Sequence, residues 1–235
     1  MKNILLVITS HTNIEGTDKS TGFSLFELVK PYFFFKNHNC NAEIASVRGG
    51  KCVPEKESML MDDPEVKQFW EDENLRRLVE NSKSLREFNP DQFVGVFFVG
   101  GTGTLWDFPY DKQVRDFASK VYCNGGVIAA VCHGSLALTN ILDQSSQPLA
   151  CGKTLTGQSN EEENQDMIQH YPVHPTQRQT SEDIFRAVGA NYCKQRPSTE
   201  NVVKDERIIT GQNLQSTFSV AAEMLQMIEQ TSGGK

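Results

Sequence analysis

Cys132 stands where its thiol could act as a nucleophile. It follows Val127–Val131, a run of small and β-branched apolar residues that is typical of a strand buried on both faces. Apolar residues then resume at helical spacing, and the small residues Ala130 and Gly134 lie two positions to either side of the cysteine. This strand-to-helix pattern resembles a nucleophile elbow, in which the helix amino terminus stabilises a thiolate. A cysteine without such a role is often only a small buried hydrophobe.

Two ionisable side chains are candidates to assist this thiol. His133 follows it directly, and Glu27 stands within an apolar segment, residues 24–35, that predicts a helix. An exposed carboxylate is the commoner state of a glutamate. A glutamate that is partly removed from water would instead hold its proton near neutral pH, which is a useful property beside a nucleophile.

A glycine-rich turn, Gly100–Thr104, follows another predicted strand at residues 93–99. It lacks both the GxGxxG spacing and the lysine of phosphate-binding loops. Its exposed backbone N–H groups could instead stabilise an oxyanion. The sequence therefore places a second piece of possible catalytic machinery at the end of a strand.

Strands and helices alternate along the chain, and this order predicts how these groups are positioned. The apolar patterns predict strands at residues 4–9, 42–47, 93–99 and 127–131, with helices between and after them. Such an order is typical of an α/β fold with a parallel sheet and helices on both faces. The carboxyl ends of its strands share one edge, so the Gly100–Thr104 turn and Cys132 should lie close together.

Three further features of the elements are expected. Pro31 should bend or end the first helix, because proline lacks an N–H and clashes with the preceding turn. Residues 202–210 should form a hairpin. A last helix at residues 214–228 should turn Phe218 inward. Residues 50–90 should add one or two surface helices, with Pro64 at a helix start.

Composition limits the classes of function. The chain has 235 residues, of which 38% are hydrophobic, enough for one large α/β domain or two small ones. A net charge of −7 without a basic block argues against nucleic acid or an anionic membrane as a partner. The six cysteines form no CxxC pair, which suits reduced thiols in the cytoplasm. No apolar run reaches transmembrane length, and the first residues read as a strand rather than a signal peptide.

A zinc site is not expected. His170 and His174 are four residues apart, but Pro172 between them spoils a metal-binding helix. The cysteines also lack the paired spacing of a zinc framework, so we expect no metal.

Several segments together resemble a known family, and in order they span nearly the whole chain. They include Ala129–Gly134, Thr21–Pro31, Gly101–Asp107, Gly152–Gly157 and Ile209–Asn213. They resemble the PfpI superfamily, the flavodoxin-like group that includes the parkinsonism-associated deglycase. Within it they resemble the glyoxalase III-like branch, which also contains stress-inducible holding chaperones. The resemblance implies a flavodoxin-like three-layer α/β/α sandwich, with residues 1–235 as a single domain and residues 50–90 as a helical excursion on its surface.

The resemblance also implies a cofactor-free active site. Cys132 would be the nucleophile, Glu27 would donate a hydrogen bond to its sulfur, and His133 would act in acid/base transfer. An acidic residue after Gly157 would orient His133. Glu163 is the direct match, although Glu161 and Glu162 are near enough to compete. Gly101, Thr102 and Ser135 would line the oxyanion site and the pocket.

The activity implied is the conversion of methylglyoxal to lactate without glutathione, by a protein that forms a homodimer. Three positions depart from the family pattern beside the nucleophile or in the pocket wall. Thr102 replaces a usual histidine, Ser135 a usual proline, and Gln158 a usual aromatic residue. These changes bear on the rate and on the substrate.

Two other functions fit the same residues. A holding chaperone for unfolded client proteins, or a redox sensor, could use oxidation of an accessible Cys132 thiolate. An amidase or peptidase could use the same fold. A glutamine amidotransferase would need a distant His-x-Glu, and the nearest candidate, His174-Pro175-Thr176, lacks the glutamate.

Overall fold

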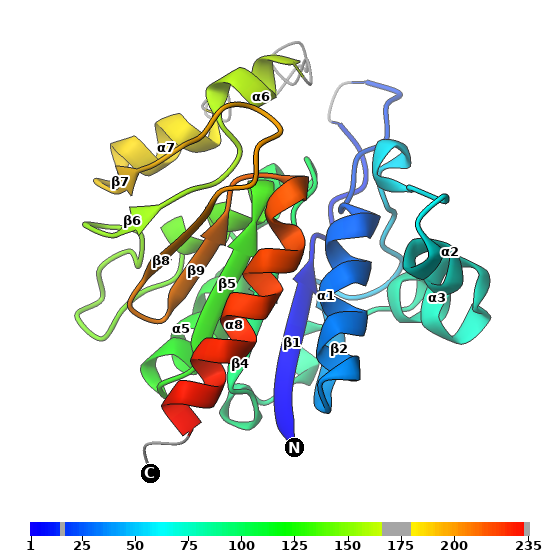
Figure 1. The fold of residues 1–235 in the computed structure, drawn as a ribbon, viewed down its shortest axis with the longest axis horizontal. Coiled ribbons are helices and arrows are strands. Elements are labelled where there is room, and N and C mark those ends of the chain that lie inside the picture. Colours follow the sequence, from blue (N-terminus) through cyan, green and yellow to red (C-terminus); the bar gives the residue numbers. More distant parts are fainter. Residues whose placement is uncertain (15–16, 166–179, 233–235) are drawn as a thin grey trace.

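The computed structural model describes residues 1–14, 17–165 and 180–232. A seven-stranded sheet lies at the centre of the molecule (Figure 1). Its strands are β1 (Lys2–Ile8), β2 (Cys40–Ser46), β3 (Lys83–Ser84), β4 (Gly95–Phe98), β5 (Val127–Val131), β8 (Val202–Asp205) and β9 (Ile208–Gly211). Their order is β3-β2-β1-β4-β5-β9-β8, and all neighbours are parallel except the hairpin β8–β9. The mainly parallel sheet predicted from the sequence is confirmed.

Successive residues of each strand feed two separate cores, because side chains alternate between the faces of a sheet. In β1, Leu6 faces one core and Leu5 the other. Helices α1 (Leu25–Asn37) and α8 (Thr217–Ser232) cover the first face, and α5 (Lys112–Cys123) covers the second. Figure 1 shows α1 and α8 side by side in front of the sheet. The result is the flavodoxin-like three-layer sandwich that the family resemblance implied.

The remaining elements connect or flank these layers. They are the helices α2 (Pro64–Glu71), α3 (Glu73–Glu80), α4 (Thr104–Asp107), α6 (Asn160–Gln165) and α7 (Ser181–Ala187), and the small parallel pair β6 (Thr154–Leu155) and β7 (Asn191–Tyr192). Short 3-10 helices are η1 (Lys56–Ser58), η2 (Leu85–Glu87), η3 (Pro90–Gln92), η4 (Cys132–Thr139) and η7 (Leu214–Ser216). No helix in the described parts of the chain combines the length and the apolar character needed to cross a membrane.

Residues 50–90 form the two helices α2 and α3, and Pro64 starts α2 behind its capping residue Asp63. The same segment also supplies the edge strand β3, which the sequence did not predict. Only its two residues pair with β2, too few to give a period-2 pattern.

Three helices differ in detail from the expectations. Helix α1 does not end at Pro31 but continues to Asn37, because Val29, Tyr32 and Phe35 are buried on both sides of the proline, and the bend expected as the other outcome stays a prediction. Phe218 is 55% exposed and packs edge-on against Phe34 of α1 instead of on the sheet.

The helix after Cys132 is the third case, because η4 is a 3-10 helix over its whole length rather than an α-helix. Its tighter turns have poorer hydrogen-bond geometry. Stabilisation of a thiolate by an α-helix dipole is therefore a weaker contribution than the sequence pattern suggested.

The order of the strands in the sheet indicates the edge at which a site is expected. From β1 the chain moves outward to β2 and β3, then returns to β4 on the other side of β1 and continues to β5. Strand order therefore reverses between β1 and β4. In open α/β sheets, sites form at the carboxyl ends of the strands beside such a reversal. The segments after β1, β4 and β5 carry Glu27, Gly100 and Cys132.

Candidate active site

Cys132 sits on a strained turn. Its φ is +54°, in the left-handed region that costs a residue with a Cβ about 1–2 kcal/mol. Glycines make room for this turn. A Cβ on Gly134 would lie 2.5 Å from the carbonyl oxygen of Phe98, and one on Gly100 would lie 2.9 Å from the Cβ of Cys132. The sharp turn implied by the elbow pattern is therefore present, and it holds the thiol at the carboxyl end of β5.

Two side chains lie against the sulfur. The thiol donates to the Oε1 atom of Gln158 at 3.0 Å, and the Nδ1 atom of His133 lies 3.6 Å from Sγ. The histidine that directly follows the cysteine therefore reaches its sulfur.

Glu27 is the third group at this position, and it is buried. Its carboxylate Oε2 accepts a hydrogen bond from the backbone N–H of Gly100 at 3.0 Å. Burial raises the pKa of Glu27 to about 8, and the nearby Glu55 also raises it, against lowering contributions from His133, Gly100 and the Cys132 thiol. Glu27 is therefore protonated at neutral pH and can donate a hydrogen bond.

The neighbouring glycine explains how Glu27 comes so near the nucleophile. A Cβ on Gly100 would lie 2.3 Å from Oε2 of Glu27. Ser24 caps α1 and accepts from the backbone N–H of Glu27, which fixes the first turn of the helix against this glycine. The acid and the thiol therefore converge on one residue that has no side chain.

Glu163 is the acid that lies beside His133. Its Oε1 is 3.5 Å from Nε2 of His133, both side chains are almost fully buried, and the same oxygen accepts from the backbone N–H of Ser181. Glu161 instead is exposed and pairs with Lys194. Glu162 is buried but holds surrounding loops, accepting hydrogen bonds from Ser159, Ser198, Gln212 and Asn213.

The Gly100–Thr102 turn is held at both ends by carboxylates. Glu27 accepts a hydrogen bond from the N–H of Gly100. Glu55 accepts hydrogen bonds from the N–H of Thr102 at 2.8 Å and from the hydroxyl of Thr21 at 3.2 Å. Burial raises the pKa of Glu55. Between them, Gly101 has φ +112°, and a Cβ there would lie 2.6 Å from the backbone of Gly22 to Ser24. These contacts fix the turn, and Gly101 lines the cavity that contains Cys132.

Ser135 lies behind the nucleophile. It is fully buried, and its hydroxyl donates to the carbonyl oxygen of Cys132 at 2.7 Å. A Cβ on Gly157 would lie 2.2 Å from this hydroxyl, so glycine is required there. The sequence placed Ser135 in the pocket, whereas in the structure it does not line the cavity and contacts the backbone of Cys132 instead.

One cavity of about 790 Å³ contains most of these groups. Its wall includes Cys132, His133, Glu27, Gly101 and Thr102, which the sequence singled out, and also Glu55 and Gln158. Much of the remaining wall is polar. Glu163 is not part of the wall and acts on it only through His133. Five of the seven residues predicted for the site therefore meet at one cavity. The other two, Glu163 and Ser135, contact the wall residues His133 and Cys132.

The comparisons with known proteins fit this geometry. The model of the DJ-1/PfpI family matches residues 19–227. The chain belongs to the DJ-1/PfpI family. The glutathione-independent glyoxalase HSP31 of Saccharomyces cerevisiae is 28% identical over 235 residues, which cover 97% of this chain and 98% of the relative.

Two solved structures of the DJ-1/PfpI fold are similar over almost the whole chain. Glyoxalase III from Candida albicans superposes with a TM-score of 0.85 at 28% identity, covering 96% of this chain and 97% of that one. The Rapid Encystment Protein 24 kDa of Francisella tularensis superposes with a TM-score of 0.90 at 34% identity, covering 97% and 99%. The family resemblance read from the motifs is thereby confirmed.

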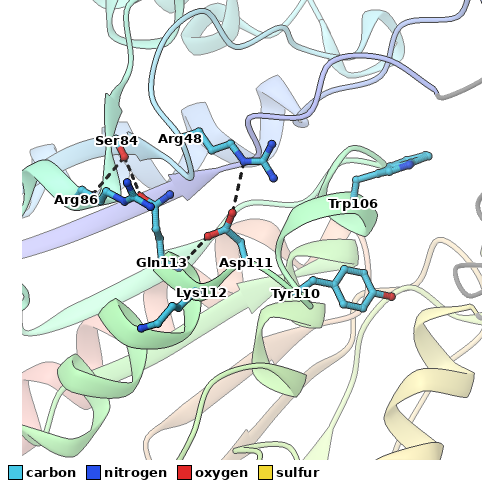
Figure 2. Close-up of a pocket in the computed structure, with 8 residues that line it drawn as sticks. All are labelled: Arg48, Ser84, Arg86, Trp106, Tyr110, Asp111, Lys112 and Gln113. Atoms are coloured by element: carbon cyan, nitrogen blue, oxygen red, sulfur yellow. Dashed lines mark hydrogen bonds and ion pairs between the residues drawn. The ribbon is translucent and has the colours of Figure 1, made fainter.

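This DJ-1/PfpI protein has a second hollow of about 740 Å³, outside the site, with an aromatic and charged wall. Figure 2 shows that its polar groups bind one another: Arg48 reaches Asp111 at 3.5 Å, and Ser84 lies between Arg86 and Gln113. Trp106 and Tyr110 point away from this network. None of the predicted site residues lines it, and its lining residues include no cysteine.

Glu55 was missed from the sequence, and the contact of Gln158 with the sulfur was not predicted. Glu55 lies in the excursion between β2 and α2, where only the fold brings it to the Gly100–Thr102 turn. Gln158 was noted as a departure from the family pattern, and that was the available signal. Among the residues that the structure describes, no group of three or more His, Cys, Asp or Glu could hold a metal ion. His170 and His174 lie outside the described residues.

Proposed function

We propose that this protein is a glutathione-independent glyoxalase that converts methylglyoxal to lactate. The observation that carries the proposal is the protonated Glu27 beside the Cys132 thiol, with both groups converging on Gly100. Relatives aligned over nearly the full chain are named glutathione-independent glyoxalases. A lyase of this kind needs a soft nucleophile, a nearby base and fixed dipoles, and the cavity contains all three.

The reaction begins with addition of the thiolate to the aldehyde carbon. A C–S bond forms, and the π pair of the carbonyl moves to its oxygen, giving a hemithioacetal after protonation. The Gly101 amide is suited to bind this oxygen, because the flanking amides of Gly100 and Thr102 are already bound by Glu27 and Glu55. The protonated Glu27 stabilises the sulfur by hydrogen bonding.

His133 then moves the proton between the two carbons. It removes the hydrogen on the former aldehyde carbon to give an enediol, and it returns a proton to the adjacent carbon, which leaves a lactoyl thioester on Cys132. Glu163 stabilises the positive charge that His133 carries between the two transfers. Water hydrolyses the thioester and releases lactate and the thiol. One carbon is oxidised while its neighbour is reduced, so the chemistry balances without an external oxidant.

The test is direct. Purified protein incubated with methylglyoxal in the absence of glutathione should produce lactate in a stoichiometric amount. Cys132→Ala should abolish lactate formation, with a loss of at least about 10³-fold, because the covalent route is removed. Absence of turnover by the wild type, or turnover that survives in Cys132→Ala, would contradict the proposal.

The same variant separates the alternatives. A holding chaperone should suppress aggregation of unfolded clients equally well with Cys132→Ala, whereas a redox sensor would lose its response to peroxide. The relatives' names favour the glyoxalase over the chaperone. The homodimer and the cytoplasmic location expected from the sequence stay predictions, which sedimentation velocity and cell fractionation test.

A further inference from the structure

Gln158 makes a contact with the nucleophile that the reaction as described above does not use. Its Oε1 lies 3.0 Å from Sγ of Cys132, closer than the Nδ1 of His133 at 3.6 Å. The side chain is 5% exposed and lines the cavity. A polar side chain that is buried against a reactive sulfur is placed there at a cost, because it gives up hydration.

The backbone on both sides of Gln158 is fixed. The hydroxyl of Tyr192 donates to the carbonyl oxygen of Gly157 at 2.7 Å, and the backbone N–H of Ser159 donates to Glu162 at 3.1 Å. Gly157 also packs directly over the hydroxyl of Ser135. These contacts hold the Gln158 side chain toward the sulfur, as second-layer contacts do in sites where position matters.

We propose that Gln158 is a catalytic residue whose carboxamide accepts a hydrogen bond from the Cys132 thiol and donates one to the thiolate and to the oxyanion formed from a bound 2-oxoaldehyde. The inference rests on the proposed function for the oxyanion step but not for the contact with sulfur. A carboxamide has an acceptor end and a donor end of nearly the same shape. A rotation of half a turn about the Cγ–Cδ bond exchanges the positions of the oxygen and the NH2 group without moving the rest of the side chain.

This exchange matches the change in charge during the first step. The S–H group of the thiol donates a hydrogen bond to Oε1. His133, whose Nδ1 lies 3.6 Å from Sγ, removes this proton and later gives it to the oxyanion formed from the aldehyde. The thiolate has no proton to donate, and Nε2 of Gln158 can then donate a hydrogen bond to the sulfur. When the sulfur attacks the aldehyde carbon, the C–S bond forms and the π pair moves to oxygen. The Nε2–H group donates a hydrogen bond to this oxygen and keeps its proton, so Gln158 assists without changing its protonation state.

Two substitutions separate the effect of the hydrogen-bond donor of Gln158 from the effect of the size of its side chain. Gln158→Glu keeps the size but removes the donor and adds a charge beside the sulfur, and Gln158→Met keeps the length but removes both polar ends. Alkylation of Cys132 by iodoacetamide as a function of pH, followed by peptide mass spectrometry, reports the thiolate directly. We expect the midpoint pH of alkylation to rise by about one unit or more in Gln158→Glu and by less in Gln158→Met.

Turnover gives the second readout. We expect kcat/KM for methylglyoxal to fall by about 10²-fold or more in Gln158→Glu and by about 10-fold in Gln158→Met, as expected for loss of one oxyanion donor. Gln68→Glu is the matched control, because Gln68 is exposed on α2 and the charge change is the same. It should leave both readouts at the wild-type value.

The outcomes are separable. A midpoint pH in both Gln158 variants equal to that of the wild type would overturn the inference, whatever the turnover. If wild-type protein shows no turnover of methylglyoxal, the proposed function fails, while the alkylation midpoint still decides the role of Gln158. Circular dichroism identifies a variant that does not fold. Gln158→Met introduces no charge, so it keeps the test available if Gln158→Glu unfolds.

Discussion

Glu27 and Glu55 accept hydrogen bonds from the same turn, two residues apart. Glu27 binds the N–H of Gly100 at 3.0 Å, and Glu55 binds the N–H of Thr102 at 2.8 Å. Both carboxyls line the cavity and both have a raised pKa, chiefly because they are buried. Glu55 also raises the pKa of Glu27, since a second carboxylate in the cavity disfavours ionisation of the first.

Removing the charge of Glu55 should make Glu27 ionise more easily. Glu55→Gln keeps an oxygen that can accept from Thr102 but carries no charge, so we expect the pKa of Glu27 to fall below its wild-type value of about 8. If protonated Glu27 is required, the alkaline limb of kcat/KM for methylglyoxal should move to lower pH by roughly half a unit to one unit. A pH profile from about 6 to 10 measures this. An unchanged limb would show that the two carboxyls are not coupled.

Glu27 should also make stability depend on pH. Its pKa in the folded protein, about 8, lies above the ordinary value of 4.5, so the folded state binds the proton more tightly than the unfolded state. This contribution to stability is complete below the ordinary pKa and is lost as the pH rises toward 8. Glu27→Gln does not titrate. It should gain stability relative to wild type as the pH rises, by several kcal/mol at most.

Urea unfolding of both proteins near pH 5 and near pH 8.5 checks this prediction. The difference in the free energy of unfolding between variant and wild type should grow with pH. A difference that is constant over this range would mean that Glu27 titrates near its ordinary value in the folded protein.

Glu163 should act through the orientation and charge of His133. Glu163→Gln keeps an oxygen that can accept from Ser181 but removes the negative charge 3.5 Å from His133. We expect kcat for methylglyoxal to fall by roughly 10–10²-fold with little change in stability. Glu161→Gln, on the exposed side of the same helix, is the matched control and should keep wild-type turnover. Equal effects from the two variants would exclude a specific role for Glu163.

Gly100 should tolerate no side chain. An alanine Cβ would lie 2.3 Å from Glu27 and 2.9 Å from the Cβ of Cys132, so Gly100→Ala should displace one of them and lower kcat/KM by at least about 10²-fold. Gly125→Ala is a control for general strain, because Gly125 has φ +92° and empty space around it. It should cost about 1–2 kcal/mol of stability and leave turnover intact. Inactivation of both variants alike would refute a steric role for Gly100.

The sequence predicts the strands and turns that position this site better than it predicts the side-chain contacts within it. The strand ending at Cys132 and the turn at Gly100–Thr104 are visible because they are local patterns: an apolar run that stops at a small or reactive residue. The parallel order then requires both to lie at one edge of the sheet.

The burial of Glu27 could not be predicted in this way. A glutamate in an amphipathic helix is usually exposed, and only the packing of the α1 amino terminus on Gly100 reverses that expectation. Glu55, and the contact of Gln158 with the sulfur, were not predicted for the same reason, since each residue lies in an irregular segment whose path is set by distant residues. Glu163 could be separated from Glu161 and Glu162 only once the structure showed which of the three lies beside His133.

The left-handed backbone at Cys132 has a thermodynamic consequence. A residue with φ +54° is more stable as glycine than as any residue that carries a Cβ, by about 1 kcal/mol. Cys132→Gly should therefore unfold at a higher urea concentration than Cys132→Ala, although neither carries a thiol. The backbone is therefore strained at the residue that carries the reactive thiol, so selection for thermal stability alone would favour glycine there, whereas a requirement for activity keeps the cysteine.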